Sequence, residues 1–213
     1  MTDLKHRILP TVQKPARYTG GEWGESKKNK EDVRLRIAFC FPDTYEIGMS
    51  HLGMKILYSQ FNARDDIWCE RVFAPWLDFE EVMRQNNIPL FAIESRDPIK
   101  DFDFLGFTLQ YEMSYTNILN MLDLAGVALK SAERTDLTPL VVAGGPCACN
   151  PEPLADFIAG ENNDAAVEEK AKEILLEDEI EILVNLKCGE FSSTAWGCDL
   201  TYDYVKINGD YRT

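Results

Sequence analysis

The sequence predicts an α/β domain built on a doubly wound parallel sheet, followed by a short α+β tail. Two observations favour this class. Between residues 33 and 158, stretches with the two-residue period of a strand alternate with stretches that have the period of a helix. Parallel neighbouring strands need helical crossovers, and this alternation provides them, so both faces of the sheet should be covered. We therefore place the compact domain at residues 33–160 and the tail at residues 161–213.

The first expected elements are an arm, a strand and a helix. Residues 1–32 carry glycines and a lysine-rich run without clear periodicity, which predicts an extended, solvated N-terminal arm. Residues 34–41 have the alternation of a strand, which Pro42–Asp43 should end. A helix is expected next, because three apolar residues recur at helical spacing: Leu52, Ile56 and Leu57.

The middle of the domain should contain a second helix and two strands. An apolar stripe predicts the helix, and it consists of Phe79, Val82 and Met83. Ile88–Pro89 should stop this helix before a short strand at residues 90–93. Residues 103–109 predict the next strand.

The last elements of the domain are a third helix and a final strand. Apolar residues line one face of the segment from Tyr115 to Ala125, and Gly126 should close this helix. Residues 139–143 are a short, fully apolar run that predicts a strand.

The tail has a different composition. Residues 164–176 predict an acidic helix with a single apolar stripe, and residues 181–186 a strand. Residues 188–213 are rich in Thr, Tyr and Trp, which favours one or two further strands. A segment of this size cannot bury a core alone, so the tail should need a host fold.

Two loops of the domain are candidates for chemistry. In a doubly wound sheet, ligands bind beyond the carboxyl ends of the strands, where residues 42–53 and 144–153 should lie. Gly144 and Gly145 follow a strand, and glycine allows a backbone to approach a nucleotide tail or a phosphate closely. We take both as candidate cofactor-binding residues, and turn geometry is an equally good explanation of them.

Charge and cysteine use restrict the partners. The 213 residues include 22 Lys and Arg against 36 Asp and Glu, a formal net charge of −14 that disfavours nucleic acid and anionic lipid. No apolar run predicts a membrane span or a signal peptide. Six cysteines without secretory context indicate reduced thiols. We expect a cytoplasmic protein whose partner is a small-molecule ligand, with no membrane and no nucleic acid.

Five runs stand out in the first three-quarters of the chain, and they are residues 14–18 (KPARY), 41–53 (FPDTYEIGMSHLG), 69–76 (CERVFAPW), 106–112 (GFTLQYE) and 143–147 (AGGPC). Together they resemble the N-terminal, cobalamin-binding-type domain of a bacterial family of radical SAM proteins. The resemblance implies a Rossmann-type, cobalamin-binding-like fold and makes cobalamin a candidate cofactor.

In that family the domain precedes a barrel whose Cys-x-x-x-Cys-x-x-Cys motif holds the iron-sulfur cluster that binds and cleaves S-adenosylmethionine. This spacing is missing here, since Cys147 and Cys149 have one residue between them and no third cysteine nearby. The iron-sulfur cluster and S-adenosylmethionine therefore belong to the missing barrel, and we expect no metal ligands in this chain.

His51 is the residue that the resemblance presents as a candidate for the lower face of cobalamin. Proteins that coordinate the cobalt from below usually carry Asp-x-His-x-x-Gly, where the Asp orients the imidazole. Here Met49 takes the position of the Asp and Met54 that of the Gly. His51 is thus a candidate cofactor-binding residue, with helix capping or loop hydrogen bonding as the alternative.

The tail resembles a second family, the bifunctional ornithine acetyltransferase and N-acetylglutamate synthase. The resemblance rests on residues 168–175 (EEKAKEIL) and above all on residues 194–213 (TAWGCDLTYDYVKINGDYRT). It implies acetyl transfer from N-acetylornithine to glutamate in arginine biosynthesis, with Asn208 and Thr213 as substrate-binding residues. Members use a threonine nucleophile released by cleavage of an Ala-Thr bond, and this chain contains no Ala-Thr dipeptide.

Three functional hypotheses follow, of which the third is a foldable remnant that has no biochemical role. The first is a cofactor-binding or interaction domain that lacks its radical SAM barrel and is fused to a foreign tail. The second is a fragment of the acetyltransferase, which would need a host acetyltransferase fold and be inactive alone. No nucleophile with a positioned base is recognisable, so we name no catalytic residue.

Overall fold

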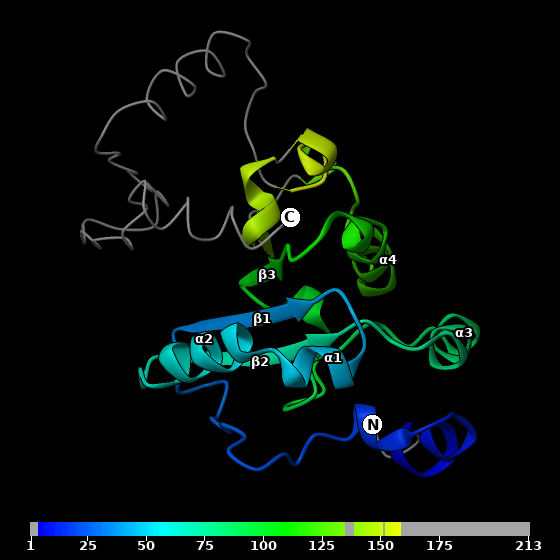
Figure 1. The fold of residues 1–213 in the computed structure, drawn as a ribbon. Helices are drawn as coiled ribbons and strands as arrows, with labels where there is room; N and C mark the ends of the chain where they lie inside the picture. The colour runs from blue at the N-terminus through cyan, green and yellow to red at the C-terminus, as the bar shows by residue number, and fades with distance from the viewer. Residues whose placement is uncertain (1–3, 135–138, 151, 159–213) are drawn as a thin grey trace, which may run out of the picture. The chain divides into compact units, whose positions relative to one another are not determined.

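The computed structural model describes residues 4–134, 139–150 and 152–158, which belong to one compact unit (Figure 1). Its centre is a four-stranded, all-parallel sheet with the order β2-β1-β3-β4. The strands are β1 (Leu35–Phe41), β2 (Ile67–Phe73), β3 (Phe104–Thr108) and β4 (Leu140–Gly144). This order is one of the two common ones among doubly wound sheets, and it confirms the predicted fold class.

Four α-helices connect the strands and cover the sheet. They are α1 (Tyr45–Ser50), α2 (Leu52–Asn62), α3 (Leu77–Asn86) and α4 (Tyr115–Ala125). Side chains alternate across β1, so Phe39 and Phe41 pack with α2 on one face. Ala38 and Cys40 pack with α3 and α4 on the other. None of the helices among the described residues is long and apolar enough to cross a membrane.

Three strands and the last helix lie where the sequence predicts them. β1, β3 and β4 match the predicted strands to within one residue at each end. α4 ends at Gly126, whose left-handed conformation lets the Val127 N–H donate to the Leu122 carbonyl. The predicted helix and strands of residues 164–213 lie outside the described residues.

Helix α2 is confirmed, but its apolar pattern does not mark its buried side. Met54 and Tyr58 face the sheet, with 2% and 8% of their surfaces exposed. The three residues that predicted the helix point the other way, since Leu52, Ile56 and Leu57 are 68%, 51% and 46% exposed.

The predicted strand at residues 90–93 is wrong, and β2 was not predicted at all. Residues 90–93 are buried, but their backbone N–H groups donate to three separate segments rather than to one neighbouring strand. Only Phe91 forms an isolated bridge, to Pro98. β2 carries Glu70 and Arg71 at its centre, and such charges hide a buried strand from hydropathy.

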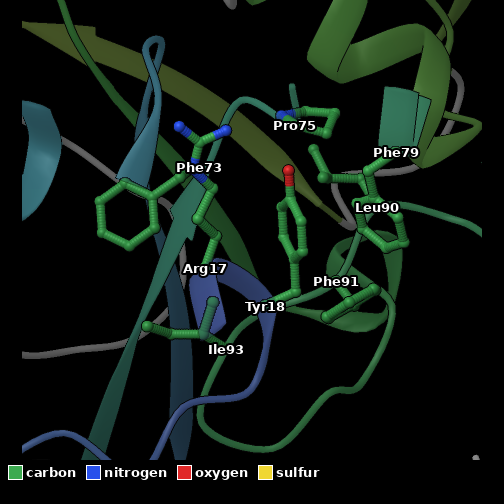
Figure 2. A pocket seen from close by; sticks show the side chains of 8 residues that line it. All are labelled: Arg17, Tyr18, Phe73, Pro75, Phe79, Leu90, Phe91 and Ile93. Carbon is green, nitrogen blue, oxygen red and sulfur yellow. The ribbon is translucent and has the colours of Figure 1, made fainter. Parts of the chain in front are cut away.

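The prediction of an extended, solvated arm is wrong for residues 4–18. Residues 4–18 form short helical turns, and Leu9, Val12 and Tyr18 are buried in the main core. Tyr18 is surrounded by Phe79, Leu90 and Phe91 (Figure 2), and its ring lies 4.1 Å from that of Phe79. The apolar residues of this segment are too far apart to show a period, although each fills a place in the core.

Candidate functional site

The carboxyl ends of the strands form the candidate site. β2 lies on one side of β1 and β3 lies on the other, so the strand order reverses between β1 and β3. The loops that follow these two strands flank that point. Asp43 follows β1 and accepts a hydrogen bond from the Thr44 N–H at 2.6 Å. Tyr111 follows β3, and its hydroxyl lies 3.4 Å from the Asp43 carboxylate.

One further polar contact ties the loop after β1 to helix α4, and another lies within the segment that follows β3. The Asn117 side chain, on α4, donates to the Pro42 carbonyl at 2.9 Å. The Gln110 amide donates to the Thr108 hydroxyl at 2.8 Å. Asp43 and Tyr111 are the residues of this junction that sequence reasoning missed, although their positions just after two strands were a usable signal.

Gly144 and Gly145 have different roles in the structure. Gly145 has a φ of 122°, and a Cβ atom there would lie 2.7 Å from the Leu109 carbonyl oxygen. The close approach of the loops after β3 and β4 therefore requires this glycine, as the turn interpretation holds. Gly144 accepts a hydrogen bond from the Leu109 N–H at 2.6 Å, but a Cβ atom on it would meet nothing within 4 Å. Of these two glycines, only Gly144 leaves open space for a ligand.

His51 caps helix α2. Its Nδ1 atom accepts a hydrogen bond from the Met54 N–H at 3.1 Å, and its ring packs against Phe41 with 5.2 Å between centroids. Because Nδ1 is the acceptor, the proton of the neutral ring lies on Nε2. Neither nitrogen then has a free lone pair for a metal. The capping alternative thus has direct geometric support.

The structure does not gather the predicted residues into one set. His51 packs at the end of β1 and Gly144 ends β4, and these strands are not neighbours in the sheet. Met49, at the position of the orienting Asp, accepts a hydrogen bond through its sulfur from Arg71 at 3.3 Å. Asn208 and Thr213 lie outside the described residues.

A buried charged cluster lies against the outer edge of β2. Arg71 donates through Nε to Glu94 at 2.6 Å, and its backbone N–H donates to the same carboxylate at 2.7 Å. Glu70 is fully buried, pairs with Arg36 at 2.5 Å, and accepts a hydrogen bond from the Ser95 N–H. These carboxylates satisfy backbone groups along and beside an edge strand, which indicates a structural role.

Burial raises the pKa of Glu94 to about 7, more than the Arg71 guanidinium lowers it. A carboxyl group whose pKa is higher in the folded state than in the unfolded state contributes its full stability at a pH below the unfolded-state pKa. That contribution is lost as the pH rises through the folded-state pKa. We expect the free energy of unfolding to fall between about pH 4.5 and pH 7 through this group. Urea titrations across that range should show a slope that Glu94→Gln reduces. An unchanged slope in the variant would contradict this assignment.

Among the described residues, neither the buried thiols of the sheet nor the cavity beside Tyr18 offers a second site. Burial raises the pKa of the Cys40 and Cys69 thiols. No group of three or more His, Cys, Asp or Glu side chains within the described ranges could hold a metal ion. The cavity beside Tyr18 (Figure 2) measures about 10 Å³, which is room for a single water at most.

Two family models match the chain in different parts. One, described as "Radical SAM proteins, N-terminal", matches residues 53–174, and the other, the ArgJ family, matches residues 151–213. The two matches overlap at residues 151–174, so the predicted junction near residue 160 falls inside the overlap. This is consistent with a chimeric chain.

The curated relatives all match a small part of their own length. The arginine biosynthesis bifunctional protein ArgJ of Caldanaerobacter subterraneus is 67% identical over 46 residues, 22% of this chain and 11% of that protein. ArgJ 1 of Clostridium acetobutylicum is 46% identical over 86 residues, 35% of this chain and 21% of that protein. The glutamate N-acetyltransferase of Methanopyrus kandleri is 61% identical over 46 residues, 22% of this chain and 12% of that protein.

The chain thus spans between a tenth and about a fifth of these relatives. No solved structure matches the chain.

Proposed function

The chain belongs to the family of radical SAM proteins through their N-terminal domain, and from this premise we propose that its described part is a cobalamin-binding-type module. The observation that carries this proposal is the carboxyl edge of the sheet. There the strand order reverses between β1 and β3, and Gly144 leaves open space at the end of β4. A small-molecule ligand would contact the protein at this edge.

The residues fit one part of cobalamin and not another. Gly144 fits the close approach of a nucleotide tail, since no side chain stands before its backbone. His51 does not fit the role of lower cobalt ligand, because Nδ1 is used for capping and Nε2 carries the proton. We therefore propose that any cobalamin bound here keeps its own base. The cobalt chemistry would be supplied by the cofactor, and this chain would only hold it.

Replacing His51 with Ala tests the two roles of this side chain. We expect a loss of about 1 kcal/mol in the free energy of unfolding, which is typical of a lost N-cap. We also expect the absorbance spectrum of aquocobalamin, titrated into the purified chain, to be the same with and without the substitution. His6→Ala, at the other histidine of the chain, is the matched control and should change neither quantity.

A different spectral result would overturn the proposal for His51. If the unsubstituted chain gave the spectrum of histidine-coordinated cobalamin, and His51→Ala removed it, the capping bond would have to break on binding.

The tail supports a second function, that of a piece of glutamate N-acetyltransferase. The supporting observation is its identity of 61–67% over 46 residues to curated proteins of that kind. We propose that Asn208 and Thr213 would hold substrate through their amide and hydroxyl groups once a host fold surrounds them. A chain that supplies only these groups can bind a substrate without transferring its acetyl group.

We expect no acetyl transfer from N-acetylornithine to glutamate by the purified chain. Acyl transfer needs an activated nucleophile and donors placed for the oxyanion. Ser192, Ser193 and Thr194 offer hydroxyls, but no histidine follows His51 in the sequence. A time course of N-acetylglutamate formation, run beside Thr194→Ala, is the measurement. Sustained turnover that Thr194→Ala abolishes would show that the tail carries its own nucleophile.

A further inference from the structure

Asp43 lies at the point of the carboxyl edge where the strand order reverses. It follows the end of β1, and it contacts the segments that follow both neighbouring strands. Its backbone carbonyl accepts a hydrogen bond at 3.0 Å from the N–H of Ala74, the residue after β2. Its carboxylate lies 3.4 Å from the hydroxyl of Tyr111, which follows β3. The backbone contact fixes Asp43 between the two loops, and the side chain is left to face whatever binds there.

The two carboxylate oxygens of Asp43 are used unequally. Oδ1 accepts a hydrogen bond from the Thr44 N–H at 2.6 Å. The 3.4 Å between Oδ2 and the Tyr111 hydroxyl exceeds the range of about 2.5–3.0 Å that an O–H···O bond favours. A carboxylate has about four acceptor sites, and Asp43 is half-buried, within reach of solvent. Oδ2 therefore keeps acceptor capacity for a ligand.

The charge of Asp43 decides which ligand groups can lie beside it. A carboxylate accepts hydrogen bonds from hydroxyl and amide donors, and it repels a phosphate of like charge. The Thr44 N–H, which could otherwise hold an anion, already donates to Asp43 itself. Glu112, the exposed residue after Tyr111, adds a second negative charge to the loop that follows β3. A phosphate group of the ligand should therefore lie elsewhere along the edge.

Gly144 offers that other place. It ends β4, which is separated from β1 by β3, so the two strand ends are about two strand spacings, roughly 10 Å, apart. A Cβ atom on Gly144 would meet nothing within 4 Å, so a phosphate can approach the backbone closely there. A ligand that reaches both positions must carry its hydrogen-bond donors well away from its phosphate. Cobalamin does so, with carboxamides around the corrin ring and the phosphate in its nucleotide tail.

On the basis of the cobalamin-binding function proposed above, we propose that Asp43 accepts a hydrogen bond from a carboxamide of the corrin ring. Asp43 would then set the direction in which the ligand lies, with the corrin rim at the loops after β1 and β3 and the phosphate toward Gly144. This residue selects for uncharged donors at the strand-order reversal.

Absorbance titrations with aquocobalamin and with aquocobinamide, a corrinoid without the nucleotide tail, test the proposal. Asp43→Asn keeps an oxygen that can accept the Thr44 N–H but removes the charge. It should raise the dissociation constants of both corrinoids about tenfold or more, as for a lost hydrogen bond to a charged group. Asp66→Asn is the matched control, because Asp66 is also half-buried but precedes β2 at the opposite edge, and it should change neither constant.

The second arm locates the two ends of the ligand. Gly144→Ala should weaken the binding of aquocobalamin and leave that of aquocobinamide unchanged. The urea midpoint of each variant checks its fold, and Asp43→Ser, which keeps a capping oxygen without the charge, should weaken both corrinoids if Asp43→Asn does not fold.

Three results would contradict the assignment of Asp43, and they differ from one another. Unchanged affinity in a folded Asp43→Asn chain would remove this carboxylate from the site. Tighter binding of aquocobalamin by that variant would place the phosphate beside residue 43, which is the reverse direction. An unsubstituted chain that binds neither corrinoid would overturn the proposed function, and the assignment of Asp43 with it.

Discussion

Replacing Glu94 with Ala is expected to lower the free energy of unfolding by about 3–5 kcal/mol. The substitution leaves the Arg71 side chain without its ion-pair partner, 2.6 Å away, while residue 71 is only 7% exposed. A guanidinium cannot lose its proton at accessible pH, so it cannot relieve the cost by neutralising. Its Nη2 atom already lacks a hydrogen-bond partner among the described residues, so the substitution would leave a second nitrogen of this buried guanidinium, Nε, without one.

Urea unfolding at about pH 8.5, where Glu94 is ionised in spite of its raised pKa, measures this effect, with Asp123→Ala as the matched control. Asp123 pairs with Arg84 at the same distance, 2.6 Å, but the two side chains are about half exposed. An exposed pair contributes only about 0–1 kcal/mol, so the control should lose little. Equal losses in the two variants would mean that burial does not set the strength of the Arg71–Glu94 pair.

The double variant Arg71→Met with Glu94→Leu separates the cost of an unpaired charge from the value of the pair. Replacing both partners of a buried ion pair with apolar residues is often neutral or stabilising. We therefore expect the double variant to recover most of the stability lost in Glu94→Ala. If it does not, the hydrogen bond from the Arg71 backbone N–H to Glu94 carries more of the stability than the ion pair does.

The same cluster explains what sequence reasoning could and could not find. β1 was predictable because its apolar residues alternate with the period of a strand, and β3 and β4 because they are short, mostly apolar runs. β2 was not predictable, because Glu70 and Arg71 are charged and the residues that pair with them are distant in the sequence. Hydropathy measures burial in apolar surroundings, and a paired charge can be buried without contributing to that signal.

The candidate site was predictable in position more than in role. Parallel topology places the ends of β1, β3 and β4 at one edge, so the loops that hold His51 and Gly144 could be named in advance. The His51 nitrogen that accepts a hydrogen bond is set by its partner Met54. Leu109 decides which of the two glycines has space in front of its Cα atom. Those contacts arise from tertiary structure and leave no pattern in the sequence.

Gly145→Ala is expected to cost about 3 kcal/mol, whereas Gly144→Ala should cost less than about 1 kcal/mol. The two positions are adjacent and receive the same methyl group. At Gly145 the φ of 122° is almost restricted to glycine, and the new Cβ atom would lie 2.7 Å from the carbonyl oxygen and 3.0 Å from the nitrogen of Leu109. Backbone atoms cannot move aside as a flexible side chain can, so the loops after β3 and β4 would have to separate.

The adjacent pair also separates folding from ligand binding at the proposed edge. Gly144→Ala should keep the urea midpoint close to that of the unsubstituted chain, because its Cβ atom meets open space. It would place a methyl group where a ligand is proposed to approach the backbone, so aquocobalamin affinity should fall although the fold is intact. A Gly144→Ala chain that binds as tightly as the unsubstituted one would remove Gly144 from the site. A Gly145→Ala chain of unchanged stability would show that the loop at Leu109 adapts more readily than the contact distances allow.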